Sequence, residues 1–586
     1  MADLYTGNDL QLPHIPDNLS IAQFMLDHQH EIRPRLDDDM PCLIDSKTKR
    51  TSSLSQLRQS TYGLANALAS NYGIGEDDKV MIMSPNHIDY PMVAWAIHRL
   101  GGIVTFSNPQ FTVDELCHQL RTANVTFMVV HSTVFNISLE AARLCGLPDD
   151  RIVLLDRPGG AHVTIPSNPL AHETVQGLVS KGLDQPCCFV ERSLKPGEGK
   201  TKVALLSWSS GTTGTPKAVA ISHYGMIANV IQMALHHRVN GKCDSRGSYF
   251  RPGDTALGVL PFYHVAGFMI SIHFVIFCSM TLVVLPKYDF LDMLDNFVRH
   301  RVSHLLLVPP QATTLSKYPH IHQHDLGSLK SLMIGAAPLS QQVQEKLGTL
   351  FPSVKIGQVY GMTEMTTVVA MLSADQQRGP LGSGGRLLPG VEVRVVRPDG
   401  TLAEAGELGE LFVRGPAAAL GYWNNAAATN ETFVNGWVRT GDQVVLGANR
   451  EVFVNDRLKE FLKVKGFQVA PAELEGALLG HPDVVDCCVI GLEDEYRGEI
   501  PLAYVVPSPS ARESMSRDPQ AASRIRESIQ KYIAERKVRY KHLDGGVRFI
   551  ETMPRNGSGK LLRRVLRQRV RGEGLQNNQL VYHSKL

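Results

Sequence analysis

Residues 203–217 read Val-Ala-Leu-Leu-Ser-Trp-Ser-Ser-Gly-Thr-Thr-Gly-Thr-Pro-Lys, a strand-like apolar run followed by a loop rich in glycine and hydroxyl side chains. Gly211 and Gly214 let the backbone turn sharply and point its N–H groups at an anion. Lys217 adds a mobile positive charge. Further hydrogen-bond donors come from Ser209, Ser210, Thr212, Thr213 and Thr215. This density predicts a polyphosphate cradle, although the stretch lacks the Gly-x-x-x-x-Gly-Lys-Ser/Thr pattern of a Walker A loop.

The sequence around this loop alternates β-branched runs with amphipathic stretches, which predicts an α/β protein of more than one domain. Strand-like runs begin at Lys79, Thr126, Arg151, Ala256 and His304. From about Ala403 short antiparallel strands are expected instead. We expect residues 1–455 to form a large α/β domain with packed sheets and a small β-barrel-like subdomain. Residues 456–586 should form a small mobile α+β domain, interrupted by a Ser/Pro-rich insertion from Ser508.

Composition excludes several classes of protein. The chain has 586 residues, of which 43% are apolar and 20% charged, and its net charge of +2 gives no global field that would favour nucleic acid. Its nine cysteines show no C-x-x-C pair and no zinc spacing, and the N-terminus lacks a secretory signal, which favours a reducing compartment. Val265–Leu285 is about long enough to span a bilayer. Its polar residues and β-branched end instead indicate a buried helix followed by a buried strand, so no transmembrane segment is expected.

The chain ends in Ser584-Lys585-Leu586. A C-terminal S-K-L is a receptor-read peroxisomal address, so we expect a peroxisomal import receptor as a partner. The protein is otherwise expected to be a monomer or a weak homodimer.

Four further motifs follow the phosphate loop in order: Gly335-Ala336-Ala337-Pro338-Leu339, Gln358-Val359-Tyr360-Gly361-Met362-Thr363-Glu364, Thr440-Gly441-Asp442 with Asp456-Arg457-Leu458-Lys459-Glu460, and Pro554-Arg555-Asn556-Gly557-Ser558-Gly559-Lys560. With these the chain resembles the adenylate-forming superfamily of acyl-CoA synthetases, 4-coumarate–CoA ligases, luciferases and peptide-synthetase adenylation domains. The resemblance runs from about Asn18 to about Arg564. It is greatest to the 4-coumarate–CoA ligase-like branch, which includes fungal peroxisomal acyl-CoA ligases.

The resemblance implies an ATP site. Glu364 would bind Mg²⁺, a hard cation suited to one carboxylate and phosphate oxygens. Tyr360 would stack on adenine beside the segment Gly335–Ala337, and Asp442 with Arg457 would hold the ribose. The remaining contacts implied for ATP come from Gly361, Thr363 and Lys560. The residues implied to carry the chemistry are Lys560, Lys217, Thr212, Glu364 and His264.

The resemblance also implies a second half-reaction. Lys459 would be a hinge about which the small domain swings, so that Lys560 leaves and coenzyme A enters. The implied coenzyme A contacts are Lys463, Lys465, Gly466, Phe467 and Gln468. The implied walls of the acyl pocket are His264, Val265, Met269, Val308, Gly361 and Met365. His264 would lie against the substrate carboxylate, but a core histidine remains an alternative.

The sequence thus predicts an acid–CoA ligase that uses ATP and Mg²⁺ to convert a fatty or aryl acid to an acyl-adenylate and then to a thioester. Two alternatives remain open at this point. One is an adenylating enzyme with another acceptor, such as an amine, a carrier protein or a luciferase-like oxidation. The other is a non-catalytic nucleotide- or acyl-binding relative.

Overall fold

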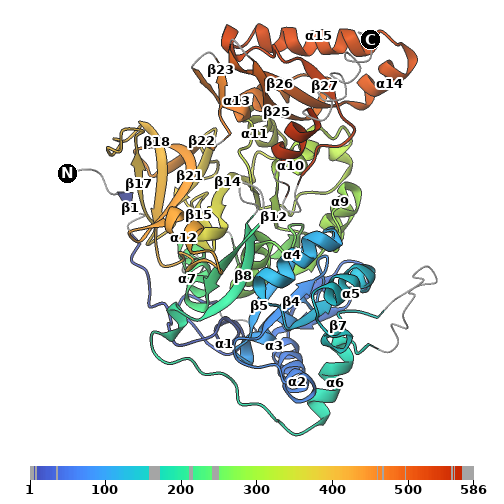
Figure 1. The fold of residues 1–586 in the computed structure, drawn as a ribbon, viewed down its shortest axis with the longest axis vertical. Coiled ribbons are helices and arrows are strands. Elements are labelled where there is room, and N and C mark those ends of the chain that lie inside the picture. Colours follow the sequence, from blue (N-terminus) through green and yellow to red (C-terminus); the bar gives the residue numbers. More distant parts are fainter. Residues whose placement is uncertain are drawn as a thin grey trace, which may run out of the picture.

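The computed structural model describes residues 5–6, 10–34, 37–157, 172–209, 216–239, 250–457, 460–464, 467–494, 497–555, 559 and 561–570. Three sheets with helices on their faces make up this part of the chain, which confirms the predicted α/β class (Figure 1). The five strand-like runs named above all form strands.

The first sheet has seven strands, of which the central ones are parallel. The order across it is β19 (Gly421–Tyr422), β9 (Lys217–Ser222), β8 (Val203–Ser209), β5 (Ile103–Ser107), β4 (Lys79–Met83), β6 (Phe127–Val130) and β7 (Ile152–Leu154). β8 and β9 are antiparallel neighbours, so the phosphate loop connects two adjacent strands.

The second sheet has fifteen strands and joins a parallel half to an antiparallel half. Its parallel strands are β2 (Pro41–Asp45), β11 (Thr281–Val284), β10 (Thr255–Gly258), β12 (His304–Leu307), β13 (Ser331–Gly335) and β14 (Lys355–Met362). Antiparallel pairing continues through β15 (Thr367–Met371), β16 (Ser383–Leu387), β22 (Glu451–Arg457), β21 (Trp437–Leu446), β18 (Leu408–Arg414), β17 (Glu392–Val396) and β1 (Tyr5–Thr6). β3 (Thr51–Ser53) pairs with β2, and β20 (Phe433–Val434) with β21.

A helical layer fills the space between these two sheets. It contains α1 (Ile21–Leu26), α3 (Tyr90–Arg99), α7 (His223–His236) and a π-helix, η5 (Gly267–Phe274), followed by α8 (Val275–Phe277). Successive side chains of β4 point to opposite faces of its sheet. Val80 and Ile82 pack in the core between the two sheets, whereas Met81 and Met83 pack against α4 and α5 on the other face.

The remaining helices of the large domain pack outside or at the edges of this core. They are α2 (Leu54–Tyr72), α4 (Val113–Ala123), α5 (Phe135–Leu144), α6 (Val175–Asp184), α9 (Phe290–Arg299), α10 (Pro309–Lys317), α11 (Gln341–Leu350) and α12 (Ala426–Thr432). α9, α10 and α11 share an apolar cluster with the outer face of the parallel half of the second sheet.

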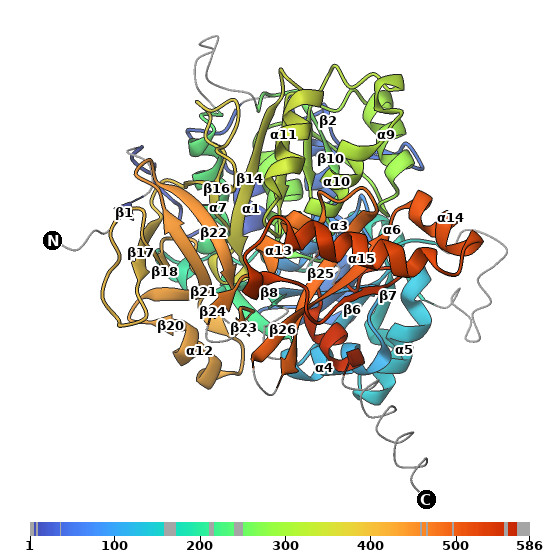
Figure 2. The ribbon, with the colours of Figure 1, turned by 90° about the horizontal axis from the view of Figure 1, so that it is seen from above.

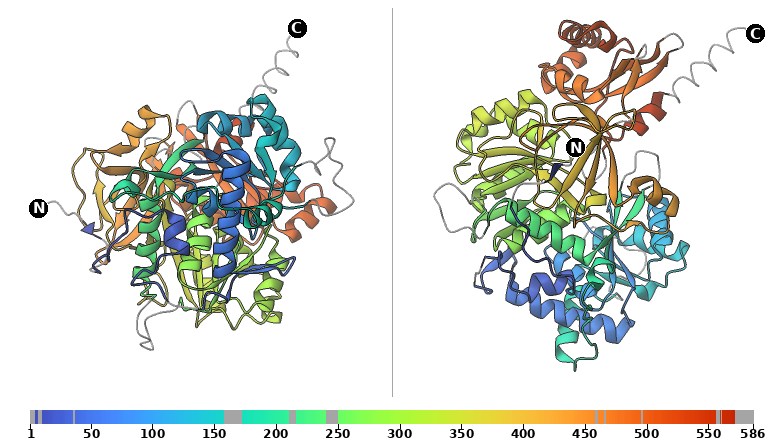
Figure 3. Two further views of the ribbon diagram at one scale, coloured as in Figure 1. Left: turned by 90° about the horizontal axis from the view of Figure 1, so that it is seen from below. Right: turned by 90° about the vertical axis from the view of Figure 1, so that its left-hand side faces the viewer.

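A five-stranded sheet forms the core of the C-terminal region: β24 (Phe467–Val469), β23 (Leu462–Val464), β26 (Gly498–Pro507), β25 (Val484–Asp494) and β27 (Val547–Phe549). The helices α13 (Pro471–Leu478), α14 (Pro509–Arg517) and α15 (Ala521–Ala534) accompany it. This region stands at one end of the molecule in Figure 1 and in the right panel of Figure 3, and covers part of the large domain when seen from above in Figure 2. The Ser/Pro-rich segment contains helix α14, because the Ser508 hydroxyl accepts from Ala511 N at 3.2 Å and Pro509 occupies the first turn.

The stretch Val265–Leu285 forms a buried helix followed by strand β11, as the sequence predicts. Among the described residues, no helix is long and apolar enough to cross a membrane.

Candidate active site

The two ends of the phosphate loop are fixed by strand pairing. Ser209 on β8 lies opposite Lys217 on β9, so the two ends of the loop lie side by side. His118 on α4 braces both ends: its Nε2 hydrogen-bonds Pro216 O at 3.2 Å, and its ring packs edge-on against Trp208. The predicted contacts Ser210, Gly211, Thr212, Thr213, Gly214 and Thr215 lie outside the described residues.

Lys217 and Glu364 are linked through a tyrosine that sequence reasoning missed. β19 pairs with β9 and sets the Tyr422 ring 5.0 Å from Lys217 Nζ, a cation–π distance. The Tyr422 hydroxyl donates to Glu364 Oε1 at 2.7 Å. Burial, and then the Glu364 carboxylate, raise the pKa of Tyr422, so it remains a donor at neutral pH. Glu364 is only 8% exposed, so its carboxylate lies in a nearly dry position beside the Tyr422 hydroxyl.

Local backbone geometry holds the segment that carries Glu364. Gly361 lies at a bulge between β14 and β15, where a Cβ would come within 1.8 Å of Thr367 O, so only glycine fits. Thr366 takes a left-handed conformation with φ of 61° after the short turn Thr363–Met365. Ala419 N donates to Glu364 O at 2.9 Å, which ties this turn to the strand that carries Tyr422.

Tyr360 and Asp442, the residues that the resemblance assigns to the nucleoside, meet in the structure. The Tyr360 hydroxyl donates to Asp442 Oδ2 at 2.7 Å, and Asp442 is 4% exposed. Arg457 lies opposite Asp442 in the pairing of β21 with β22; its side chain lies outside the described part. At the carboxyl end of β13, Gly335 pairs with Val359, so the exposed turn at Ala336 and Ala337 lies next to Tyr360.

The residues implied to bind the acid are mostly buried. Val265, Met269 and Met365 share the inner core, and Thr367 Oγ1 donates to Val265 O at 3.3 Å. His264 is half-buried, and its Nδ1 accepts from Ala266 N at 3.2 Å.

Val308 connects this region to the small domain. A Cβ on Gly559 would lie 3.1 Å from Val308 Cγ2, and Gly559 has a φ of 84°, which favours glycine. Arg555 holds the turn in place: its guanidinium donates to Gly559 O and to Asp486 Oδ1, each at 2.7 Å. The residue that precedes Lys560 therefore touches a predicted wall of the acyl pocket.

Several predicted residues lie outside this description. Lys459, Lys465, Gly466 and Lys560 are among the undescribed residues, and the side chains of Lys463, Phe467 and Gln468 are not described either. The backbones of β23 and β24, which carry the last three, pair in antiparallel register.

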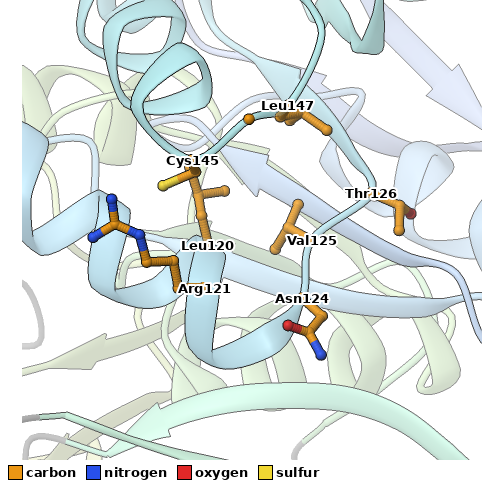
Figure 4. A pocket seen from close by; sticks show the side chains of 8 residues that line it. Leu120, Arg121, Asn124, Val125, Thr126, Cys145 and Leu147 are labelled. Carbon is orange, nitrogen blue, oxygen red and sulfur yellow. The ribbon is translucent and has the colours of Figure 1, made fainter.

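A search for metal ligands and one pocket complete the geometry. Within the described ranges, no group of three or more His, Cys, Asp or Glu side chains is arranged to hold a metal ion. A cavity of about 390 Å³ lies between the end of α4 and the turn after α5, lined by Leu120, Arg121, Asn124, Val125, Thr126, Cys145, Gly146 and Leu147 (Figure 4). It contains none of the residues of the candidate active site.

Comparison with known proteins identifies the class. Residues 31–423 match the AMP-binding enzyme family, and residues 473–560 match the AMP-binding enzyme C-terminal domain. The acyl-CoA ligase easD of Emericella nidulans is 34% identical over 94% of this chain and 97% of its own length. The 4-coumarate–CoA ligase 1 of Arabidopsis thaliana is 30% identical over 95% and 94%.

Solved structures agree on the fold. An anthranilate CoA ligase in complex with anthranoyl-AMP superposes with a TM-score of 0.78 at 22% identity, covering 94% of this chain and 97% of that one. ATP-bound MatB from Rhodopseudomonas palustris gives 0.76 at 23% identity, covering 94% and 98%.

The chain belongs to the AMP-binding enzymes, within which its relatives are acyl-CoA and 4-coumarate–CoA ligases. It activates a carboxylic acid with ATP to an acyl-adenylate and transfers the acyl group to coenzyme A.

The hydroxyl of Tyr422 is expected to matter for ATP use. Tyr422→Phe keeps the ring beside Lys217 and removes the bond to Glu364, so kcat/KM for ATP in acid-dependent pyrophosphate exchange should fall roughly tenfold, the usual effect of losing a hydrogen bond to a charged group. Tyr422→Leu also removes the ring beside Lys217, so its kcat/KM for ATP should be lower still. Tyr62→Phe, on the surface of α2, is the control. Wild-type kinetics for Tyr422→Phe would show that the bond is incidental.

Proposed function

We propose that this acid–CoA ligase acts on fatty or aryl acids, with the residues described above in the following roles. The task is electrostatic: a carboxylate with a pKa of about 4 is ionised at neutral pH and repels the triphosphate that it must attack. Lys217 and the loop 209–217 would hold the phosphates, and Lys560 would bridge the carboxylate and the α-phosphate as charge redistributes. The observation that carries this proposal is the contact of Gly559 with Val308, next to Lys560 in sequence.

Nucleoside binding would rest on the Tyr360–Asp442 pair. Asp442 fixes the position of the Tyr360 hydroxyl and so helps to hold the ring on which adenine would stack. Asp442 and Arg457 would then meet the ribose, and Thr363 the α-phosphate. Gly335, Ala336 and Ala337 offer small side chains at the adenine edge.

Glu364 fits a magnesium ion bound with the triphosphate. Oε1 accepts from Tyr422, and Oε2 has no hydrogen-bond partner in the part of the chain that the structure describes. A nearly buried carboxylate needs a compensating cation. Since no group of three or more His, Cys, Asp or Glu side chains is arranged for a metal in the described ranges, phosphate oxygens would supply much of the coordination. Bound magnesium would neutralise phosphate charge.

The second half-reaction would require rotation of the small domain about Lys459, with residues 456–586 as the moving unit. In the described arrangement Lys317 Nζ donates to Leu479 O at 3.1 Å and Val484 O at 3.0 Å, which docks this unit on α10. Rotation would break these bonds and bring Lys463–Gln468 to the site, where Gly466 would admit the pantetheine arm.

The two half-reactions should separate by mutation. Lys560→Ala should lower acid-dependent pyrophosphate exchange by roughly 10²-fold or more, because it removes transition-state charge stabilisation, yet still ligate supplied acyl-adenylate to coenzyme A. Gly466→Trp should do the reverse. Equal loss of both half-reactions in both variants would contradict the rotation.

The acid should be apolar. Benzoate or octanoate should support pyrophosphate exchange with a higher kcat/KM than acetate or malonate, because Val265, Met269 and Met365 are buried and apolar. The measurement is exchange across a panel at fixed ATP and pH, where all these acids are ionised. A preference for acetate or malonate would exclude the proposed substrate class.

We also propose a peroxisomal location, read by an import receptor, for a monomer or weak homodimer. Deleting Ser584-Lys585-Leu586 should leave the kinetics unchanged and move a fluorescent fusion, tagged at the N-terminus, from peroxisomes to the cytosol. Persistent peroxisomal fluorescence would remove the assignment.

A further inference from the structure

Asn86 joins the two large sheets through three hydrogen bonds. It follows β4 of the seven-stranded sheet, and its side chain is only 5% exposed. Its Nδ2 donates to Gly258 O at 3.1 Å and Leu260 O at 2.9 Å, and its Oδ1 accepts from Phe262 N at 2.7 Å. Both amide hydrogens and the carbonyl oxygen are therefore used on one short segment of the other sheet.

That segment is a short connection between strand β10 and His264, and contacts along it restrict its conformation. Gly258 is the last residue of β10, and His264 N donates to Pro261 O at 3.1 Å. A Cβ on Gly267 would lie 2.0 Å from Pro261 O, so the following helix presses directly on the turn. A shift at Phe262 must consequently move His264.

Aromatic packing fixes the same segment from the side. The fully buried Phe262 ring packs edge-on against Tyr90, with 5.9 Å between centroids. Tyr90 begins α3, four residues after Asn86. The Asn86 amide and the contact between Phe262 and Tyr90 thus both hold residues 258–264 against residues 86–90, which lead from β4 into α3.

We propose that Asn86 is a positioning residue for the acid: it sets the place of His264 beside the substrate carboxylate by fixing the backbone of residues 258–262. The inference rests on the proposed acid-binding role of His264. The hydrogen bonds of the Asn86 side chain hold the segment that leads to His264. Tyr360, Glu364 and Asp442, which are proposed to bind ATP, are held by other hydrogen bonds. Loss of the amide should therefore weaken use of the acid and spare the binding of ATP.

The chain supplies a matched control in Asn66 on α2. Its side chain is fully buried, donates to Gly182 O at 2.9 Å and Pro186 O at 3.1 Å, and accepts from Cys188 N at 2.8 Å. The bonding pattern repeats that of Asn86, but it ties α6 and the following segment to α2. Asn→Asp is isosteric at both positions and sets a carboxylate against two carbonyl oxygens.

The test compares Asn86→Asp with Asn66→Asp in the full-length enzyme. Asn86→Asp should raise KM for the acid in pyrophosphate exchange roughly tenfold or more, as expected for lost buried hydrogen bonds, while KM for ATP changes less than about twofold. Asn66→Asp should lower the melting temperature about as much as Asn86→Asp does. It should leave the KM values for the acid and for ATP within about twofold of those of the wild type. If Asn86→Asp does not fold, Asn86→Ala, which buries no charge, replaces it with the same expectations.

Hydrogen exchange gives a readout that does not depend on turnover. Peptides covering residues 258–268 should exchange faster in Asn86→Asp than in wild type or Asn66→Asp, and peptides covering 355–371 should not. Wild-type exchange of residues 258–268, or equal rises in KM for acid and ATP, would overturn the positioning role. A wild-type enzyme without acid-dependent pyrophosphate exchange would instead overturn the proposed function.

Discussion

The antiparallel pairing of β9 with β8 on one side and β19 on the other is the constraint on which the site depends. Main-chain bonds from Leu420 N to Ala220 O and from Trp423 N to Ala218 O, each 2.8 Å, fix the register of β19. A slip by one residue would turn Tyr422 to the other face and break its contacts with Lys217 and Glu364 together. Residues more than two hundred positions apart become neighbours only because this register is set.

Both buried carboxylates of the site are held by tyrosine hydroxyls, Glu364 by Tyr422 and Asp442 by Tyr360. A neutral donor orients a carboxylate without cancelling its charge, whereas an arginine partner would satisfy it with an ion pair. Burying a charge is costly, and a cation at Glu364 would relieve that cost. Tyr422 thus orients Glu364 and leaves its charge for the proposed cation to compensate.

Sequence reasoning anticipated what short motifs encode and missed what depends on register. The strands from Lys79 to His304 follow from local pattern, and the family resemblance pointed to Tyr360 and Asp442, which the structure brings together. Tyr422 stands 58 residues after Glu364 in no phosphate-binding pattern, so only the pairing of β19 reveals it. Asn86 was equally hidden, because its partners lie more than 170 residues away. The need for glycine at Gly361 likewise becomes visible only when Thr367 O is placed against it.

The contacts within the large domain differ chemically from the contact that docks the small domain, which is proposed to move. Buried neutral amides connect the two large sheets and their intervening helices: Asn86 binds residues 258–262, and Asn229 on α7 exchanges two bonds with the backbone of Val368. Breaking these hydrogen bonds would leave polar groups unpaired in an apolar core, so moving the two sheets apart would cost free energy. The small domain is docked differently, since Lys317 meets carbonyls near the end of α13, and burial lowers the pKa of this lysine. An ammonium regains hydration when it is released, which offsets part of the cost of opening this contact. A large domain joined by buried amides and a small domain held by a contact that water can replace would suit the proposed rotation.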